Sequence, residues 1–196
     1  MPQSPTHCTA FQGLTRLASG TAAQVALSVK AALEHQPDHP VLVFDDATGR
    51  QVDFDLRGTP AEVTARLAPA EAGEAERPPR GPGRPRLGVV AREVTLLPRH
   101  WDWLNEQPGG ASVALRRLVE AARTAHAASD RARQARQAAD RFMAAMAGNQ
   151  PGYEEASRAL YAGDRARFEA ETAGWPGDIR DHARWLAHAG LEAEAG

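Results

Sequence analysis

A run rich in proline and glycine, residues 68–86, most constrains how this 196-residue chain can fold. The run begins with alanine and glutamate and continues as arginines separated by proline and glycine. Proline lacks a backbone N–H, and the run shows no apolar periodicity, so we interpret it as a flexible linker. It divides the chain into a predicted unit at residues 8–67 and a second part at residues 87–196.

The first part has the pattern of a small α+β unit. Residues 10–17 are predicted as a strand, and residues 21–34 as an amphipathic helix that begins after the N-cap residue Thr21. A short helix is expected after Thr59, because proline at the first helical position lacks only an N–H that would be unpaired there. Strands and helices that follow one another in this way favour an α+β fold.

A β-hairpin is predicted within this first part. Two β-rich runs, residues 41–44 and 51–56, flank a turn that contains aspartate and glycine. In the second run, apolar residues alternate with Asp53 and Asp55, so one face should be buried and the other solvated. These two carboxylates, with Asp45 and Asp46, also form a candidate cation site, although the alternation alone explains Asp53 and Asp55.

The second part is predicted to be mainly helical. Residues 111–147 contain neither glycine nor proline, which predicts one long helix or two, ending at residues 148–152. Two shorter helices are expected at residues 153–173 and 178–191. The predicted small helical core consists of Phe142, Met143, Met146, Leu160, Tyr161, Phe168, Trp175, Ile179 and Trp185.

Charge is segregated along the chain although the net charge is only −2. Residues 77–147 carry 13 arginines and 6 acidic residues, whereas the segments before and after them are acidic. A basic segment favours an anionic partner such as nucleic acid. The alternative is an electrostatic clasp, in which the acidic segments of the same molecule cover the basic one.

The composition indicates a cytoplasmic protein. Cys8 is the only cysteine, so neither a disulfide within the chain nor a cysteine-rich zinc site is possible. Residues 1–10 do not have the pattern of a signal peptide, and no segment approaches the roughly 20 apolar residues of a membrane helix. We therefore expect no membrane association.

No catalytic motif is present in the sequence. It contains no glycine-rich phosphate loop, no Gly-x-Ser-x-Gly elbow and no His-Glu-x-x-His helix. Asp178 and His182 are spaced i, i+4 on a predicted helix with His188 nearby, but such a pair is more typical of a surface than of a metal site. We expect a protein that is not an enzyme, with no metal, no cofactor and no small-molecule ligand.

Residues 88–125 combine a short strand, a helix from Pro98, a Gly109–Gly110 turn and a second helix near Ser112. This order resembles the ribbon-helix-helix family of bacterial DNA-binding proteins and covers about a fifth of the chain. In that family, two chains pair one strand each into a ribbon that enters the major groove. The resemblance therefore implies a DNA-binding homodimer.

The predicted DNA contacts come from the linker, the strand, the turn and the second helix. Proline-spaced arginines at the end of the linker resemble a minor-groove AT-hook, and amides at the start of a helix can bind a phosphate. The strand register stays open, because one register presents Glu93 and Thr95 to DNA and the other presents Arg92 with two apolar residues. The predicted residues are Arg84, Arg86, Arg92, Thr95, Gly110, Ser112, Arg116 and Arg117.

Two readings without DNA compete with this one. The segment 88–125 also fits an edge strand and two helices of an ordinary packed domain. Alternatively, the chain is a protein-interaction or structural module, with the arginine- and alanine-rich helix at residues 130–140 exposed. A partner that buries Trp101 and Trp103 would bind with little dependence on salt, unlike nucleic acid.

The chain as a whole resembles a family of uncharacterised bacterial proteins, domain of unknown function 2239. The resemblance rests on residues 44–59, residues 87–104 and residues 159–168, together with Trp175 and Pro176. It implies a bacterial protein and no particular activity.

Overall fold

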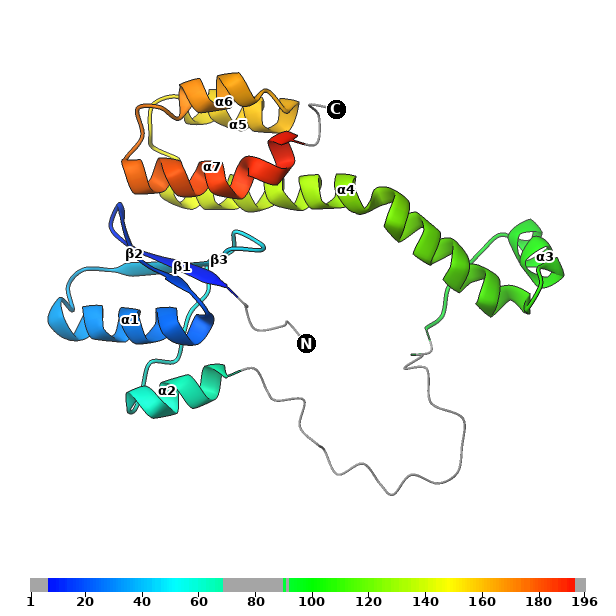
Figure 1. Ribbon diagram of the computed structural model, residues 1–196, viewed down its shortest axis with the longest axis horizontal. Helices are drawn as coiled ribbons and strands as arrows, with labels where there is room; N and C mark the ends of the chain where they lie inside the picture. The colour runs from blue at the N-terminus through cyan, green and yellow to red at the C-terminus, as the bar shows by residue number, and fades with distance from the viewer. Residues whose placement is uncertain (1–6, 69–89, 91, 193–196) are drawn as a thin grey trace. The chain divides into compact units, whose positions relative to one another are not determined.

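The computed structural model describes residues 7–68, 90 and 92–192. The chain forms two compact units (Figure 1): residues 1–71 with 128–196, here called the sheet unit, and residues 72–127, here called the helix-pair unit. The C-terminal helices thus group with the N-terminal strands, whereas the sequence boundaries of 8–67, 68–86 and 87–196 place these helices in one part with residues 87–127. The predicted linker lies outside the described residues, apart from Ala68.

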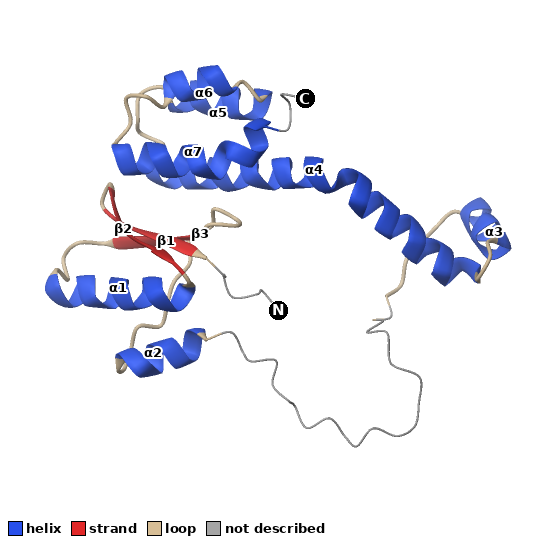
Figure 2. Ribbon diagram, in the orientation of Figure 1, coloured by secondary structure: helices blue, strands red, loops and turns tan. Residues whose placement is uncertain are grey.

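The sheet unit is built on a three-stranded antiparallel sheet in the order β2-β1-β3. Its strands are β1 (Cys8–Gln12), β2 (Thr15–Gly20) and β3 (Val41–Asp45). In β1, Thr9 pairs with Ser19 of β2 on one side and with Phe44 of β3 on the other. With its helices (Figure 2), this sheet gives an α+β fold, as predicted.

A single strand at residues 10–17 is a wrong prediction. The chain reverses there, because Gly13 adopts a left-handed conformation with φ +59° between β1 and β2. Glycine reaches such angles without the Cβ clash that penalises other residues, and tight hairpin turns require them. The segment is therefore a hairpin of two short strands.

Helices α1 (Ala22–His35) and α2 (Pro60–Leu67) begin where the sequence predicts. Thr21 and Thr59 are their N-caps, and each forms a reciprocal capping box with the glutamine or glutamate three residues later. The cap hydroxyl satisfies a backbone N–H that has no partner inside the helix. In α1, the buried face includes Val25 and Val29, which pack with β1 and β3 in a small cluster.

The predicted hairpin of residues 41–44 and 51–56 forms at its turn, but its second run does not become a strand. The Asp45 N–H donates to the Arg50 carbonyl at 2.9 Å, and Phe44 pairs with Gln51 in an isolated bridge. The Val52 N–H donates to the Val43 carbonyl at 2.9 Å, but residues 52–57 are not a strand. The predicted alternation nevertheless holds: Val52, Phe54 and Leu56 are half-buried against the α1 cluster, and the aspartates between them are exposed.

The remaining elements are helices α3 (Pro98–Glu106), α4 (Gly110–Met146), α5 (Tyr153–Ala162), α6 (Arg165–Glu171) and α7 (Gly177–Glu192). Residues 111–147 therefore form one long helix, which settles one of the alternatives left by the sequence. The predicted helix 153–173 is two helices. Gly163, with φ +71°, ends α5, and the Asp164 carboxylate caps α6 by accepting from the Arg167 N–H at 3.0 Å.

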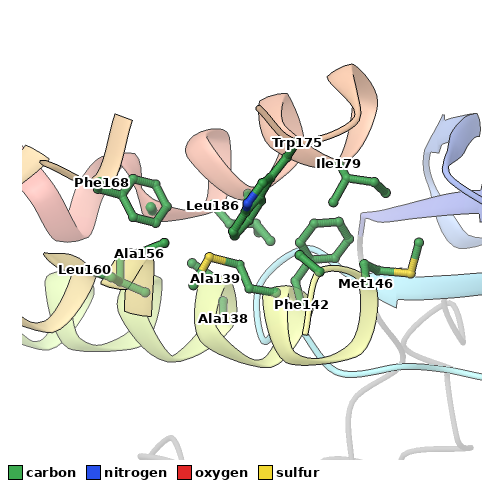
Figure 3. Close-up of a cluster of buried hydrophobic side chains, with 14 of the residues drawn as sticks. Ala138, Ala139, Phe142, Met146, Ala156, Leu160, Phe168, Trp175, Ile179 and Leu186 are labelled. Carbon is green, nitrogen blue, oxygen red and sulfur yellow. The ribbon is translucent and has the colours of Figure 1, made fainter. Parts of the chain in front are cut away.

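The main core lies where α4, α5, α6 and α7 meet the sheet (Figure 3). Phe142 on α4 contacts both Phe11 of β1 and Phe44 of β3, with ring centroids 5.3 and 5.1 Å apart. The predicted core residues are buried with two exceptions, Tyr161 and Trp185, which are 51% and 57% exposed. The Tyr161 hydroxyl instead donates to the Asp140 carboxylate at the surface, 3.1 Å away.

The predicted strand before α3 is not present in the described part of the chain. Residues 90 and 92–97 form neither strand nor helix, and no described strand lies beside them in a sheet. A strand requires a partner for its backbone groups, and none is found there among the residues that the structure describes. The helix predicted from Pro98 begins at that residue.

Candidate functional sites

The helix-pair unit consists of α3, a short turn and the first part of α4. Gly109 and Gly110 both have positive φ, at +85° and +74°, which only glycine adopts freely. The Gly110 N–H donates to the Gln107 carbonyl at 2.8 Å. Among the described hydrophobic residues of this unit, only Leu104 and Ala114 are buried.

This unit exposes a large share of its apolar side chains. Of the ten large hydrophobic residues that are exposed in the described parts of the chain, seven lie between residues 90 and 119. They are Val90, Val94, Leu97, Trp103, Val113, Leu118 and Val119. Beside them, a groove of about 470 Å³ is lined by Leu96, Arg99, His100, Trp103, Leu104, Leu115 and Leu118. Large exposed apolar surfaces often mark interaction sites in proteins, so this groove and its surroundings are a candidate site.

The structure places the predicted DNA-binding residues in different surroundings. Arg84 and Arg86 lie outside the described residues. Arg92 and Thr95 are exposed in the irregular segment before α3. The remaining four lie in the first two turns of α4, where Gly110 is half-buried and Ser112, Arg116 and Arg117 are exposed.

Gly110 lies in the predicted phosphate-binding turn, residues 109–112. Its N–H is already bonded to the Gln107 carbonyl and cannot donate to a ligand. The N–H groups of the next residues in the first turn of α4, Ala111 and Ser112, have no intrahelical acceptor. Arg116 and Arg117 make no ion pair within the described ranges, whereas Arg123, about two turns on, is paired with Glu120 at 3.1 Å.

A second cluster of functional side chains surrounds Asp46 in the sheet unit. Its side chain is only 4% exposed and lies just after β3. The Oδ2 atom accepts from the Thr9 hydroxyl at 3.1 Å and lies 2.5 Å from His7 Nδ1. Because the Thr9 hydroxyl donates its hydrogen to Asp46, the Ser19 hydroxyl must be the donor in its 3.0 Å hydrogen bond with Thr9. His7 is thus held by a buried carboxylate.

His182 on α7 faces the same carboxylate. Its Nε2 lies 3.6 Å from Asp46 Oδ1, too far for a hydrogen bond, and neither atom has another partner among the described residues. The ring is wedged against Phe11 and Phe142 and stacks on Trp185 at 5.5 Å. Burial lowers the pKa of His182 to about 4, so the imidazole is neutral at neutral pH.

Cys8 neighbours this cluster but is not a reactive thiol. It is fully buried in β1, and burial, followed by the charges of Asp45 and Asp46, raises its pKa to about 12. Thiolate, the nucleophilic form, is therefore negligible at neutral pH.

Sequence reasoning missed the Asp46–His182 pair. It assigned His182 to a surface pair with Asp178, but the Asp178 carboxylate instead accepts from the Arg16 N–H at 2.7 Å. No local spacing connects an aspartate after β3 with a histidine on α7. The only available signal was that His182 falls on the apolar face of α7, between the buried residues Ile179 and Leu186.

No metal or membrane feature is found in the described ranges. They contain no group of three or more His, Cys, Asp or Glu side chains arranged to hold a metal ion. Asp53 and Asp55, which the sequence offered with Asp45 and Asp46 as a cation site, project to solvent. Among the helices described here, none is long and apolar enough to cross a membrane.

Comparison with known proteins identifies a family for the chain. No curated protein and no solved structure shows significant similarity to it. One family model does match, over residues 7–187, which include all three strands and both of the sites described above. The chain therefore belongs to the family of uncharacterized proteins conserved in bacteria, DUF2239.

Proposed function

We propose that this protein is a homodimeric DNA-binding regulator whose helix-pair unit provides both the dimer contact and the DNA contact. The observation that carries the proposal is the concentration of exposed large hydrophobic residues between residues 90 and 119. No catalytic step is assigned to this unit. Its role is recognition.

A second copy of the same unit is the partner that fits this surface best. The described part of the unit has two buried hydrophobic residues, Leu104 and Ala114, and small units with little core gain stability by association. It carries both a groove and projecting apolar side chains such as Val119, as an isologous pair requires. Its rim has charges of both signs, including Arg99 and Asp102, so that two copies can meet with opposite charges.

The DNA contact is assigned to the start of α4. Arg116 and Arg117 are exposed and unpaired within the described ranges, so binding a phosphate breaks no existing ion pair. The first-turn N–H groups at Ala111 and Ser112 carry the positive end of the helix dipole. Dimerisation would also bring two copies of residues 90–97 together, which supplies the strand partner that one chain lacks.

Fluorescence anisotropy of a labelled DNA duplex with the full chain tests this proposal. We expect binding that strengthens steeply as salt falls, persists at about 150 mM salt, and weakens at least 10-fold in R116A/R117A. The matched control is R158A/R167A, which removes the same charge from arginines that pair with Glu155 in the sheet unit. Absence of binding, or equal losses in the two double variants, would contradict the assignment.

A protein-interaction module without nucleic-acid binding is the second candidate. It is favoured by the charge of the described part of the helix-pair unit, residues 90 and 92–127, which contains five arginines and four carboxylates. This is close to balance, and DNA-binding surfaces are usually strongly positive. If the chain associates through its apolar groove but does not change the anisotropy of DNA at any salt concentration, this candidate replaces the first.

A further inference from the structure

A cleft in the sheet unit has the size and lining of a small-molecule site. It lies between α4 and α7, is closed at one wall by the turn after β3, and has a volume of about 580 Å³. Cavities that bind small ligands typically measure roughly 300–1,000 Å³ and are mostly apolar with a few polar groups. The residues that define this cleft chemically are Asp46, Arg131, Gln134, Trp185, Leu186 and His188.

Trp185 gives the cleft an aromatic wall. Its ring is 57% exposed although it belongs to a helix whose neighbouring apolar residues are buried. One face stacks on His182, with the ring planes 25° apart, which fixes the orientation of the indole. An oriented, exposed indole favours stacking with another planar ring.

Asp46 and Arg131 give the cleft two groups of opposite charge. Asp46 Oδ1 is a buried acceptor without a hydrogen-bond partner in the described structure, and such an atom is normally satisfied by a donor. Arg131 is exposed on α4 and has no ion-pair partner in the described ranges. The His188 Nε2 atom, also at the cleft, lies 3.2 Å from the Glu192 carboxylate.

We propose that this cleft binds a small molecule that combines a planar ring, an N–H donor and one anionic group. The ring stacks on Trp185, the donor satisfies Asp46, and the carboxylate or phosphate pairs with Arg131. Nucleoside monophosphates and aromatic amino acids both carry this combination. This differs from the sequence-based expectation of no small-molecule ligand, because the sequence does not bring β3, α4 and α7 together.

Isothermal titration calorimetry of the full chain with four probes, GMP, AMP, phenylalanine and tyrosine, tests the proposal. We expect at least one probe to bind with a Kd below about 1 mM. Preference for the first two assigns the ligand to the nucleotides, and preference for the last two assigns it to the amino acids. If none of the four binds at millimolar concentration, the proposal is wrong.

Variants test whether binding occurs in this cleft. Trp185 and Arg131 are exposed, so W185A and R131A should fold, which circular dichroism checks. We expect W185A to weaken binding at least 10-fold, W185F to restore most of it, and R131A to weaken an anionic probe more than its uncharged analogue. The matched control is W103A, an exposed tryptophan in the other unit. Equal affinity in W185A and in the native chain would overturn the proposal, and neither result depends on DNA binding.

Discussion

His182 is buried where a charge on its ring would be costly. Only 4% of its side chain is exposed, and three aromatic rings surround it. Asp46, 3.6 Å away, favours the charged form, but burial is the larger effect and holds the pKa at about 4. The neutral imidazole is therefore part of the folded state.

The stability of the protein should depend on pH through this residue. In the unfolded chain the pKa of His182 returns to about 6.5, so between about pH 6.5 and pH 4 the unfolded state binds more protons. Stability from His182 is then present above pH 6.5 and is lost as the pH falls toward 4. We expect H182Q to reduce the loss of unfolding free energy between about pH 7 and pH 5, measured by urea denaturation.

His188 provides the matched control for this measurement. It lies on the same helix but its side chain is 57% exposed, so H188Q should retain the native pH dependence. If H182Q and H188Q lose stability toward acid to the same degree, the pH dependence does not come from burial of His182.

Residue types and local spacing predicted exposure at some positions and not at others. The alternation in residues 52–56 was sufficient to separate Phe54 from Asp53 and Asp55, because one strand-like segment meets the core on one side. Trp185 was predicted to be buried, because large aromatic residues usually are. Its exposure depends on how α7 is rotated against α4, which is decided by contacts far apart in the sequence.

At the scale of elements, the turn after β3 meets α4 with unusual closeness. Gly49 has φ +65°, and a Cβ at this position would overlap the Ala138 carbonyl of α4. The Arg141 guanidinium donates to the neighbouring Thr48 carbonyl at 2.7 Å, which joins the same two elements. This contact sets the distance between the sheet and the long helix.

Replacement of Gly49 should therefore destabilise the sheet unit strongly. We expect G49A to lower the free energy of unfolding by roughly 3 kcal/mol or more, because both the backbone angle and the overlap with α4 oppose alanine. Gly13, with φ +59° and no atom near its missing Cβ, is the matched control. G13A carries the backbone cost alone, about 1–2 kcal/mol, in the same thermal or urea unfolding measurement.

Similar losses in G49A and G13A would show that the close approach to α4 contributes nothing. A larger loss in G49A would assign the difference to that contact.

Helix starts were predictable from the sequence, and strand pairing was not. Thr21 and Thr59 sit at their caps because the capping box involves residues only three apart. The chain reversal at Gly13 and the end of α5 at Gly163 also have a local signal in the sequence, which is the glycine itself. Both glycines take positive φ, which glycine adopts more readily than other residues. Pairing of β1 with β3 joins residues about thirty or more positions apart, and no pattern within either strand specifies that partner.

At the scale of the whole molecule, the chain consists of two units that differ in how much apolar surface they bury. The sheet unit has an extensive core that includes Phe11, Phe142 and Phe168, and it holds the Asp46–His182 pair. The helix-pair unit has little core and a large exposed apolar surface. This contrast supports the proposal that the second unit associates with another molecule.

Sedimentation velocity of the full chain tests this central claim most directly. We predict a dimer of the 21.0 kDa chain at micromolar concentration, and a monomer for L118D, since Leu118 is 44% exposed and lines the groove. The control L14D places the same charge on a leucine that is 47% exposed in the sheet unit, and it should remain a dimer. A monomeric native chain, or an L118D variant that still dimerises, would contradict the account.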